Sequence, residues 1–431
     1  MNLSFNNNST LQNLLNDAIN SGIINLDEVS DRVYEMKNKK FLERHPYKIS
    51  KNRDGRYSSY LPDETKPNNR RKIVKSSLEE LEKTIIKYYK ECDEQQEYKK
   101  LCLRSLYPEW LNYKSLHTDS GGYIKTIDHL WIKFYLNDSI IDEPIQNLDR
   151  YKLDTWAHEK IKENRMTKKQ YYNMAIIMRQ ALDLAVDKGI ISENPFTKVK
   201  INFKLFYSVP KKPDETQVFL IDEQPLIEKE AYKDFEKTNH TACLGIILAF
   251  QTGLRISELV GLKFSDINEE IEDCIHVQRM EVRDYHKNPD GTWSSPERII
   301  TERTKSLAGT RNVYLTSTAK MIIEKIKESN IQNGYDNSGY MFINKKGRMT
   351  SLCFNDRIRR YCRTVNISER GMHKIRKTFI STLIDADLNI NYIRQQVGHV
   401  DERTTYGNYC FNRRPKDLTA VEVERALVHN F

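Results

Sequence analysis

The sequence lacks any run of apolar residues long enough to span a membrane, which takes roughly 18 of them. Its first residues have neither the basic nor the apolar region of a secretory signal, so we expect no such signal. The seven cysteines include no CxxC pair and are odd in number. These features argue against a zinc module or a secreted disulfide framework and predict a reducing cytoplasm as the location.

Two signatures of cofactor chemistry are also missing. The sequence has no GxxxxGK[ST] loop for a nucleotide phosphate and no cluster of Asp and Glu residues for a metal ion. We therefore expect no cofactor. Of the 431 residues, 39% are hydrophobic, which is enough for packed cores and excludes wholesale disorder. The length favours two or three domains.

The positive charge of the chain is concentrated in one segment. The formal net charge is +9, and residues 37–75 alone hold 13 Lys and Arg against 4 Asp and Glu. Such a segment can be a solvated, loop-rich surface, but here its pattern predicts a folded module, so we favour contact with nucleic acid. The candidate DNA-binding residues are Lys48, Lys51, Arg53, Arg56, Arg70, Arg71, Lys72 and Lys75.

The basic segment has the pattern of a small three-stranded sheet followed by a helix. An Asp54-Gly55 turn separates two stretches rich in β-favouring residues, Tyr47–Ile49 and Tyr57–Leu61. A third stretch, Lys72–Val74, precedes a pair of serines, either of which can cap a helix. A sheet this thin can place a basic face in a DNA groove.

The rest of the chain is mainly helical, which predicts a multi-domain protein of the α+β class. Apolar spacing near 3.6 residues recurs through residues 101–196, as in a four-helix bundle. Further on, helices frame strand-like stretches at Ile275–Val282, Arg298–Glu302 and Arg311–Leu315. The predicted divisions are a polar helical lead (1–36), the basic module (37–92), the helical bundle (101–196), a basic linker (197–222) and a mixed domain (223–431) that ends in a tail helix.

The mixed domain carries cationic side chains at suggestive places. In TGLRISELV, Gly253 ends one helix and Arg255 begins the next, with Glu258 three residues on and on the same helical face. Lys305 lies in a turn between two strand-like stretches, from which its ammonium can reach a site. Taken singly, an Arg–Glu pair or a turn lysine is more often an ordinary surface feature.

A second group of candidates lies nearer the C-terminus. His373 and Arg376, in HKIR, are three residues apart, so both project from one face of a helix. His399 follows a glycine that permits close backbone approach, and Tyr409 lies ten residues beyond it. A lone histidine is more often a hydrogen-bonded core or surface residue than a catalytic group.

Together these residue types suit the cleavage of a phosphodiester by a tyrosine. Two guanidinium groups match the non-bridging oxygens of a pentavalent phosphorane, and fixed positive charge stabilises it. A tyrosine with its normal pKa of about 10 is mostly protonated at neutral pH. The cations would favour its phenolate form, and a histidine could accept the proton.

These motifs, in this order, resemble those of the tyrosine recombinase (phage-type integrase) family. TGLRISELVGLKFSDI is similar to the family's first arginine box, and MHKIRKTFISTLIDADLNINYIRQQVGHVDERTTYGNY to its second box through the nucleophile. The resemblance covers residues 223–412. The helical segment 101–195 resembles the family's core-binding domain, and residues 37–92 resemble the arm-binding modules of conjugative-transposon integrases.

The resemblance implies an enzyme that cuts and rejoins DNA at specific sites to integrate and excise a mobile element. Arg255 and Arg376 would clamp the scissile phosphate, with Glu258 supporting the first arginine. His373 would act in proton transfer, and His399 would bond a phosphoryl oxygen.

The resemblance also assigns the leaving group and the nucleophile. Lys305 would protonate the departing 5′ oxygen, and Tyr409 would form a 3′-phosphotyrosyl intermediate. Tyr406 is the rival nucleophile. The family's Thr-Thr pair aligns with Thr404-Thr405, and the nucleophile falls four residues after the second Thr, which favours Tyr409.

The implied partners are duplex DNA at core sites and arm sites, other copies of the chain in a tetramer, and an excisionase or directionality factor. The tail helix (417–428) can pack within its own subunit or dock on a neighbouring one. Composition rich in Asn, Ile and Lys indicates an AT-rich bacterial genome, with the protein associated with the nucleoid. Two other functions stay open, a DNA-binding regulator that retains the fold without catalysis and a DNA-relaxing enzyme like type IB topoisomerases.

Overall fold

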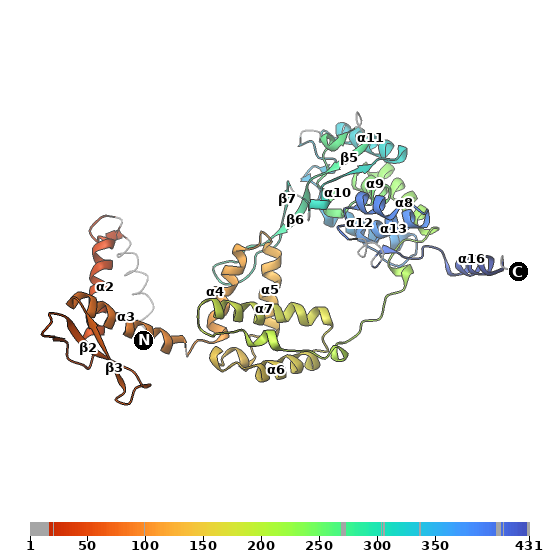
Figure 1. Cartoon of the computed structure of the whole chain (residues 1–431). Helices are drawn as coiled ribbons and strands as arrows, with labels where there is room; N and C mark the ends of the chain where they lie inside the picture. Colours follow the sequence, from red (N-terminus) through yellow and green to blue (C-terminus); the bar gives the residue numbers. More distant parts are fainter. Residues whose placement is uncertain are drawn as a thin grey trace, which may run out of the picture. The chain divides into compact units, whose positions relative to one another are not determined.

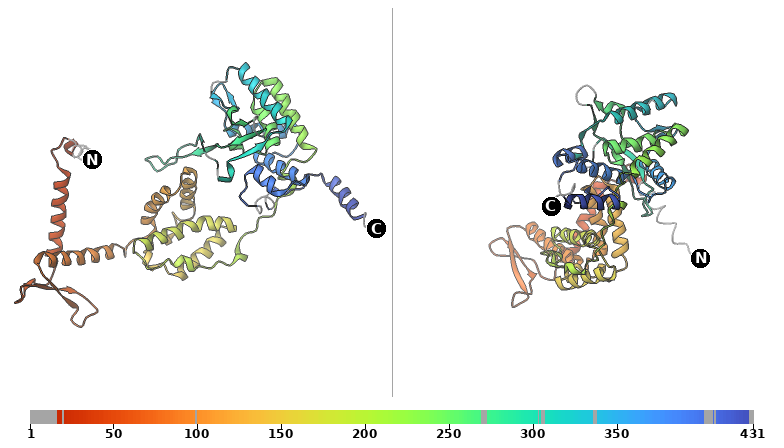
Figure 2. Two further views of the ribbon diagram at one scale, coloured as in Figure 1. Left: turned by 45° about the horizontal axis from the view of Figure 1, so that its top comes forward. Right: turned by 90° about the vertical axis from the view of Figure 1, so that its right-hand side faces the viewer.

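The computed structural model of the chain describes residues 17–19, 21–98, 100–268, 273–302, 304, 307–335, 338–401, 407 and 409–428. The chain divides into two compact units, Met1–Lys114 with Ile127–Tyr207 and Ser115–Thr126 with Ser208–Phe431. Helices predominate, and the strands form small antiparallel sheets (Figures 1 and 2). The predicted class, a mainly helical α+β protein, is confirmed.

A small module at the start of the first unit has one three-stranded sheet. Its strands are in the order β1-β2-β3, and Gly55 turns between the first two with a φ of +84°. Leu61 of the sheet packs with Leu81 and Ile85 of the following helix. The elements are α2 (Leu26–Glu43), β1 (Ser50–Lys51), β2 (Tyr57–Pro62), β3 (Arg70–Lys75) and α3 (Leu78–Tyr98).

Three boundaries of this module differ from those expected. Helix α2 runs across the expected division at residue 36 because its C-terminal Phe41 and Leu42 pack on the module's core. Strand β1 begins at Ser50, after the expected Tyr47–Ile49, since Ser50 pairs with Ser58 across the turn. Helix α3 continues beyond residue 92 to Tyr98.

Four longer helices make up the bundle that follows. Its centre is aromatic, with the rings of Tyr107 and Trp131 stacked at 3.8 Å. Thr167 and Gln170 form a reciprocal capping box that starts the last of these helices. The helices are α4 (Leu103–Leu116), α5 (Gly121–Phe134), α6 (Arg150–Glu163) and α7 (Lys168–Asp187).

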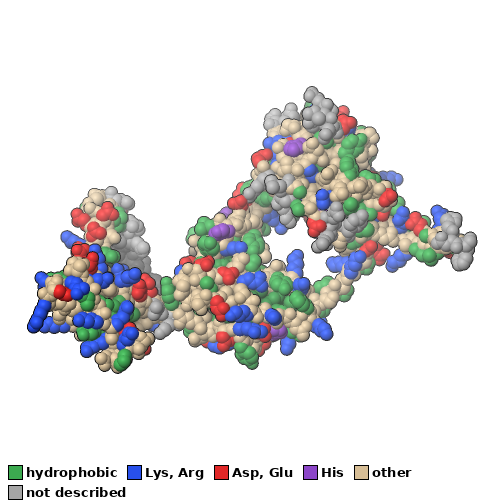
Figure 3. All heavy atoms as spheres, in the orientation of Figure 1, with side chains coloured by type: hydrophobic (Ala, Val, Ile, Leu, Met, Phe, Trp, Pro, Cys, Tyr) green, Lys and Arg blue, Asp and Glu red, His purple; other side chains and the backbone are tan. Residues whose placement is uncertain are grey.

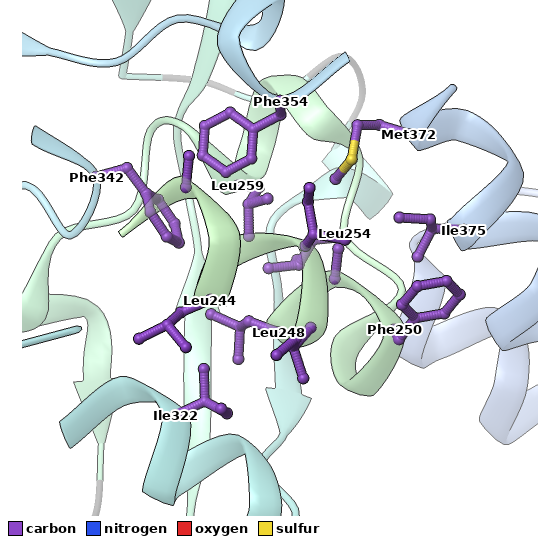
Figure 4. Close-up of a cluster of buried hydrophobic side chains, with 14 of the residues drawn as sticks. Leu244, Leu248, Phe250, Leu254, Leu259, Ile322, Phe342, Phe354, Met372 and Ile375 are labelled. Carbon is purple, nitrogen blue, oxygen red and sulfur yellow. The ribbon is translucent and has the colours of Figure 1, made fainter. Parts of the chain in front are cut away.

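Helix α9 (Ala242–Thr252) is the central helix of the second unit. It is apolar all round, and α8, α11, α12 and α13 pack against it. Figure 4 shows Leu244 and Leu248 beside Ile322, with Phe250 beside Ile375. The surrounding helices are α8 (Glu223–Thr238), α10 (Ile256–Leu259), α11 (Ser317–Gln332), α12 (Ser351–Thr364), α13 (Met372–Asp385) and α14 (Ile390–Val397).

The strands of the second unit flank this helical core. The expected strand Ile275–Val282 is in fact two strands, because the chain breaks where Arg279 turns inward to pair with buried Asp266 at 2.6 Å. Strand β5 then pairs with β8, and β6 with β7. The strands are β4 (Ile267–Asn268), β5 (Cys274–Val277), β6 (Met280–Asp284), β7 (Glu297–Thr301), β8 (Arg311–Tyr314), β9 (Ile343–Asn344) and β10 (Gly347–Arg348).

The last residues of the predicted linker belong to the core of the second unit. Phe219 is fully buried and packs edge-on against Phe250 with ring centroids 5.4 Å apart. Its backbone N–H donates to the Thr378 hydroxyl at 2.8 Å. A linker assignment for residues 197–222 therefore runs too far, since the apolar pair Val218 and Phe219 begins the packed core.

The tail helix α16 (Lys416–Val428) has no buried residue. Its apolar side chains are about half exposed or more, among them Leu418, Val421 and Leu427. Figures 1 and 2 show it extending away from the rest of its unit. Among the helices of the described residues, none combines the length and the apolar character needed to cross a membrane.

Candidate active site

The first arginine of the site is held at a sharp helix boundary. Gly253 ends α9 with a φ of +60°, and a Cβ there would overlap the ring of Phe379. Arg255 then begins α10, and its guanidinium donates from Nη1 to Glu258 Oε1 at 2.6 Å. The other oxygen of Glu258 accepts the backbone N–H of Arg255 at 3.0 Å. One buried carboxylate therefore fixes both the backbone and the side chain of Arg255.

The second arginine lies under the first. Arg376 of α13 is only 1% exposed, and it donates from Nη1 to the Gly253 carbonyl at 2.8 Å. Its Nη2 donates to the Val397 carbonyl and lies 3.1 Å from His399 Nε2. Burial, with the nearby Arg255 charge, lowers the pKa of Arg376 to about 9. That value is above neutrality, so Arg376 is a buried cation at pH 7.

His399 is brought to these arginines by a left-handed glycine. Gly398 ends α14 with a φ of +64°, and an added Cβ would lie 2.6 Å from the Ala308 carbonyl. The carbonyl of Gly398 accepts a hydrogen bond from Arg255 Nη2 at 3.2 Å. Burial and the charge of Arg376 lower the pKa of His399 to about 3, so its imidazole is neutral at pH 7.

The ring of Tyr409 lies near both histidines of the site. Its ring centroid is 4.7 Å from that of His399 and 6.0 Å from that of His373. Ser381 holds the tyrosine's backbone, donating from Oγ to the Tyr409 carbonyl at 2.6 Å and accepting from the Phe411 N–H at 3.2 Å. The phenol is therefore at the edge of a cationic cluster, partly exposed to solvent.

Five of the six predicted catalytic side chains, and the supporting Glu258, thus converge from α10, α13 and the segment after α14. The sixth, Lys305, and the rival nucleophile Tyr406 lie outside the described residues. The arrangement puts two guanidinium groups, two imidazoles and a phenol within one site. This set can bind and stabilise a phosphate while a tyrosine oxygen approaches it.

Known proteins are similar to this chain in sequence and in fold. The phage integrase family matches residues 222–414 of the chain. A tyrosine recombinase of Agathobacter rectalis is 30% identical over 49% of this chain and 62% of its own length. The ICEBs1 integrase of Bacillus subtilis is 23% identical over 66% of this chain and 73% of its own.

The chain is similar to the phage integrase family over residues 222–414. Its fold is that of the tyrosine recombinases, as in the Tn1549 transposon integrase solved in complex with a circular intermediate DNA. That structure superposes with a TM-score of 0.54 at 19% identity, covering 76% of this chain and 99% of that one. The chain spans 62% and 63% of the length of two tyrosine recombinases that it matches.

One buried residue of this site was missed from the sequence. Arg311, the first residue of β8, is 9% exposed and pairs with Glu258 at 2.9 Å. A signal was present, because Arg311 and Val313 share the inward face of β8 while Asn312 and Tyr314 point outward. A charged residue at an inward strand position needs a buried partner.

The predicted DNA-binding residues of the basic module do not share one face. The register places Arg70 and Lys72 on the face that α3 leaves open, where Arg70 lies over the Tyr60 ring at 4.5 Å. Figure 3 shows blue Lys and Arg side chains gathered on this module. Lys51, Arg71 and Lys75 lie on the side of the sheet that packs on α3, although exposed, and Arg56 pairs with Asp54 in the turn.

The buried His399 predicts a pH dependence of stability. Because its folded pKa is lowered from 6.5 to about 3, the unfolded chain binds more protons between these values. The contribution of neutral His399 to the free energy of unfolding is therefore complete above pH 6.5 and is lost as the pH falls towards 3. Between pH 7 and pH 5 the loss from this one group is roughly 2 kcal/mol.

Urea unfolding at both pH values tests this expectation. His399→Gln should narrow the difference in unfolding free energy between pH 7 and pH 5 by that amount, whereas the exposed His286→Gln should not change it. An unchanged difference in His399→Gln would show that folding does not lower the pKa of His399.

Proposed function

We propose that this chain is a site-specific DNA recombinase that cuts and rejoins DNA through a 3′-phosphotyrosyl intermediate. The observation that carries the proposal is the position of Tyr409, whose ring lies beside His399 while His399 Nε2 is 3.1 Å from the buried Arg376. A nucleophile next to a preorganised cationic site is what attack on a phosphodiester requires.

In the proposed reaction, Arg255 and Arg376 bind the non-bridging oxygens of the scissile phosphate. His399 donates a hydrogen bond to one of them, and His373 accepts the phenolic proton. The oxygen of Tyr409 bonds to phosphorus as the bond to the 5′ oxygen breaks.

The departing 5′ oxygen takes a proton, a role that the family resemblance gives to Lys305. The energy of the phosphodiester is conserved in the tyrosyl ester, so rejoining is the reverse attack by a 5′ hydroxyl and needs no nucleotide.

A nicked suicide substrate tests the proposal. The duplexes should be tiled across the junctions of the mobile element that carries the gene, with a nick that lets the cleaved end diffuse away. We expect a covalent protein–DNA adduct with a subset of them. A DNA-binding regulator would bind without forming an adduct, and a topoisomerase-like enzyme would relax any supercoiled plasmid without site preference.

The proposed partners follow from the module surfaces and from the relatives. The Tn1549 integrase is solved in complex with DNA, and we assign core sites to the helical bundle with the catalytic unit and arm sites to the basic module. The exposed apolar residues of α16 favour docking on a neighbouring copy, as in a tetramer on bacterial nucleoid DNA. A directionality factor would choose between integration and excision.

Replacing Arg70 and Lys72 by alanine should weaken binding to arm-site DNA and leave core-site cleavage unchanged. Each lost phosphate contact reduces the slope of log K against log salt by about 0.9. Fluorescence anisotropy over a salt series measures this slope.

The matched control replaces Lys83 and Lys87, exposed lysines on α3 and therefore away from the open face of the sheet. That pair should leave arm binding nearly unchanged. Equal losses at arm and core sites in the Arg70 and Lys72 variant would contradict a separate arm function.

A further inference from the structure

Arg311 connects three segments of the candidate site. Its Nη2 donates to Glu258 Oε2 at 2.9 Å, and its Nη1 lies 3.3 Å from Glu258 Oε1. The same Nη1 donates to the Gly309 carbonyl at 2.8 Å, and Nε donates to the Gln396 carbonyl at 2.7 Å. One guanidinium therefore ties the start of β8 to α10 and to the end of α14.

Two of these contacts lie next to groups that the chemistry needs. Gly309 ends the short helical turn 307–309, which follows Lys305 in the sequence. Gln396 is three residues before His399, and a Cβ at Gly398 would lie only 3.1 Å from Arg311 Nη1. Loss of the Arg311 side chain would free both the turn 307–309 and the corner at Gly398 that carries His399, which approach each other at Ala308.

The contact with Glu258 also controls how Arg255 is held. Oε1 of this carboxylate lies against Nη1 of Arg255 and Nη1 of Arg311. Oε2 accepts from the backbone N–H of Arg255 and from Nη2 of Arg311. Burial alone would raise the pKa of Glu258, but Arg311 and Arg255 outweigh it and lower the pKa to about 2. With Arg311 absent, the full charge of a buried carboxylate would fall on Arg255.

We infer that Arg311 is a positioning residue for strand cleavage. It neutralises Glu258 so that this carboxylate does not draw the guanidinium of Arg255 away from the phosphate, and it fixes the corner that carries His399. Arg311 does not itself reach the phosphate, because its nitrogens are committed to Glu258, Gly309 and Gln396. This inference rests on the proposed recombinase function.

Single-turnover cleavage of a nicked duplex that the wild-type chain cleaves tests the inference. At saturating protein, Arg311→Met should form the covalent adduct about 100-fold more slowly than the wild-type chain, because a small displacement of catalytic groups lowers the rate by about that factor. The dissociation constant for the same duplex should stay within about threefold, since Arg311 makes no DNA contact. Arg311→Lys should recover only part of the rate, because an ammonium cannot serve three acceptors in a fixed plane.

A matched control separates positioning from general stability. Arg357→Met removes another largely buried arginine of the same unit, one that pairs with Asp234 at 2.6 Å and bonds no site residue in the described structure. This variant should lose thermal stability as Arg311→Met does and should cleave near the wild-type rate. Equal slowing of the two variants at equal melting temperature would overturn the inference.

A double variant tests the electrostatic part. If Arg311 acts by neutralising Glu258, then adding Glu258→Gln to Arg311→Met removes the unbalanced carboxylate, and cleavage should rise at least about fivefold over Arg311→Met alone. A double variant slower than Arg311→Met, or an Arg311→Met that cleaves at the wild-type rate, would overturn the inference. Failure of the wild-type chain to form any adduct would instead contradict the proposed function.

Discussion

Tyr409→Phe will abolish the covalent protein–DNA adduct, a loss of at least roughly 10⁴-fold in cleavage, because no other group in the described site can take the place of the nucleophile. The ring remains, so its packing against Ile380, Ile393 and Val397 is preserved. DNA affinity and melting temperature should therefore stay close to those of the wild-type chain. A suicide-substrate assay resolved on a denaturing gel, with anisotropy for binding, measures both properties.

Two other tyrosines provide the controls for this substitution. Tyr392→Phe removes a hydroxyl from the exposed side of α14, and this variant should cleave DNA at the wild-type rate. Tyr406→Phe removes the rival nucleophile and should still form the adduct. A full-strength adduct in Tyr409→Phe, with none in Tyr406→Phe, would move the nucleophile to Tyr406 and contradict the site described above.

Arg376→Met will reduce cleavage by roughly 10²–10³-fold or more, since it removes a buried cation from the phosphate site. Two opposing terms determine the effect of this substitution on the stability of the folded state. Burying a charge is costly, but the variant leaves the Gly253 and Val397 carbonyls and His399 Nε2 without their donor, at about 1–3 kcal/mol for an unsatisfied group. We expect a net loss of stability together with the loss of cleavage.

The test of Arg376 compares single-turnover cleavage with thermal unfolding in three variants. Arg376→Lys keeps the charge without the planar fork, so it should recover folding better than cleavage. The Arg357→Met variant, with a similar stability cost, should cleave near the wild-type rate. Cleavage by Arg376→Met above about one tenth of the wild-type rate would show that Arg376 does not bind the phosphate.

The contacts of the site that the sequence predicted are those with a local cause. Glu258 lies three residues from Arg255, and His373 lies three residues from Arg376, so helical geometry alone places each pair on one face. The sequence also predicted that Gly253 ends a helix, whereas Gly398 was predicted only to permit close backbone approach and proves to be a left-handed helix end as well. That the Arg255–Glu258 pair and the His373–Arg376 pair lie together in one site was predicted only from the resemblance to tyrosine recombinases.

The features that the sequence did not predict depend on contacts between distant residues. Arg311 and Glu258 are 53 positions apart, so no periodicity connects them. The break between β5 and β6 follows from the buried pair of Arg279 with Asp266, and the end of the linker follows from Phe219 reaching Thr378. In each case a tertiary partner decided the local structure, which propensity cannot anticipate.

The most direct test of the account is to find which residue carries the DNA after cleavage. Trypsin digestion of the trapped adduct should release a peptide spanning residues 404–413, which contains both candidate tyrosines. After nuclease trimming, fragmentation in a mass spectrometer locates the remaining 3′-phosphonucleotide. We predict that it lies on Tyr409. Its attachment to Tyr406, or to any residue outside this peptide, would contradict the claim that the cationic cluster and the Tyr409 phenol form one active site.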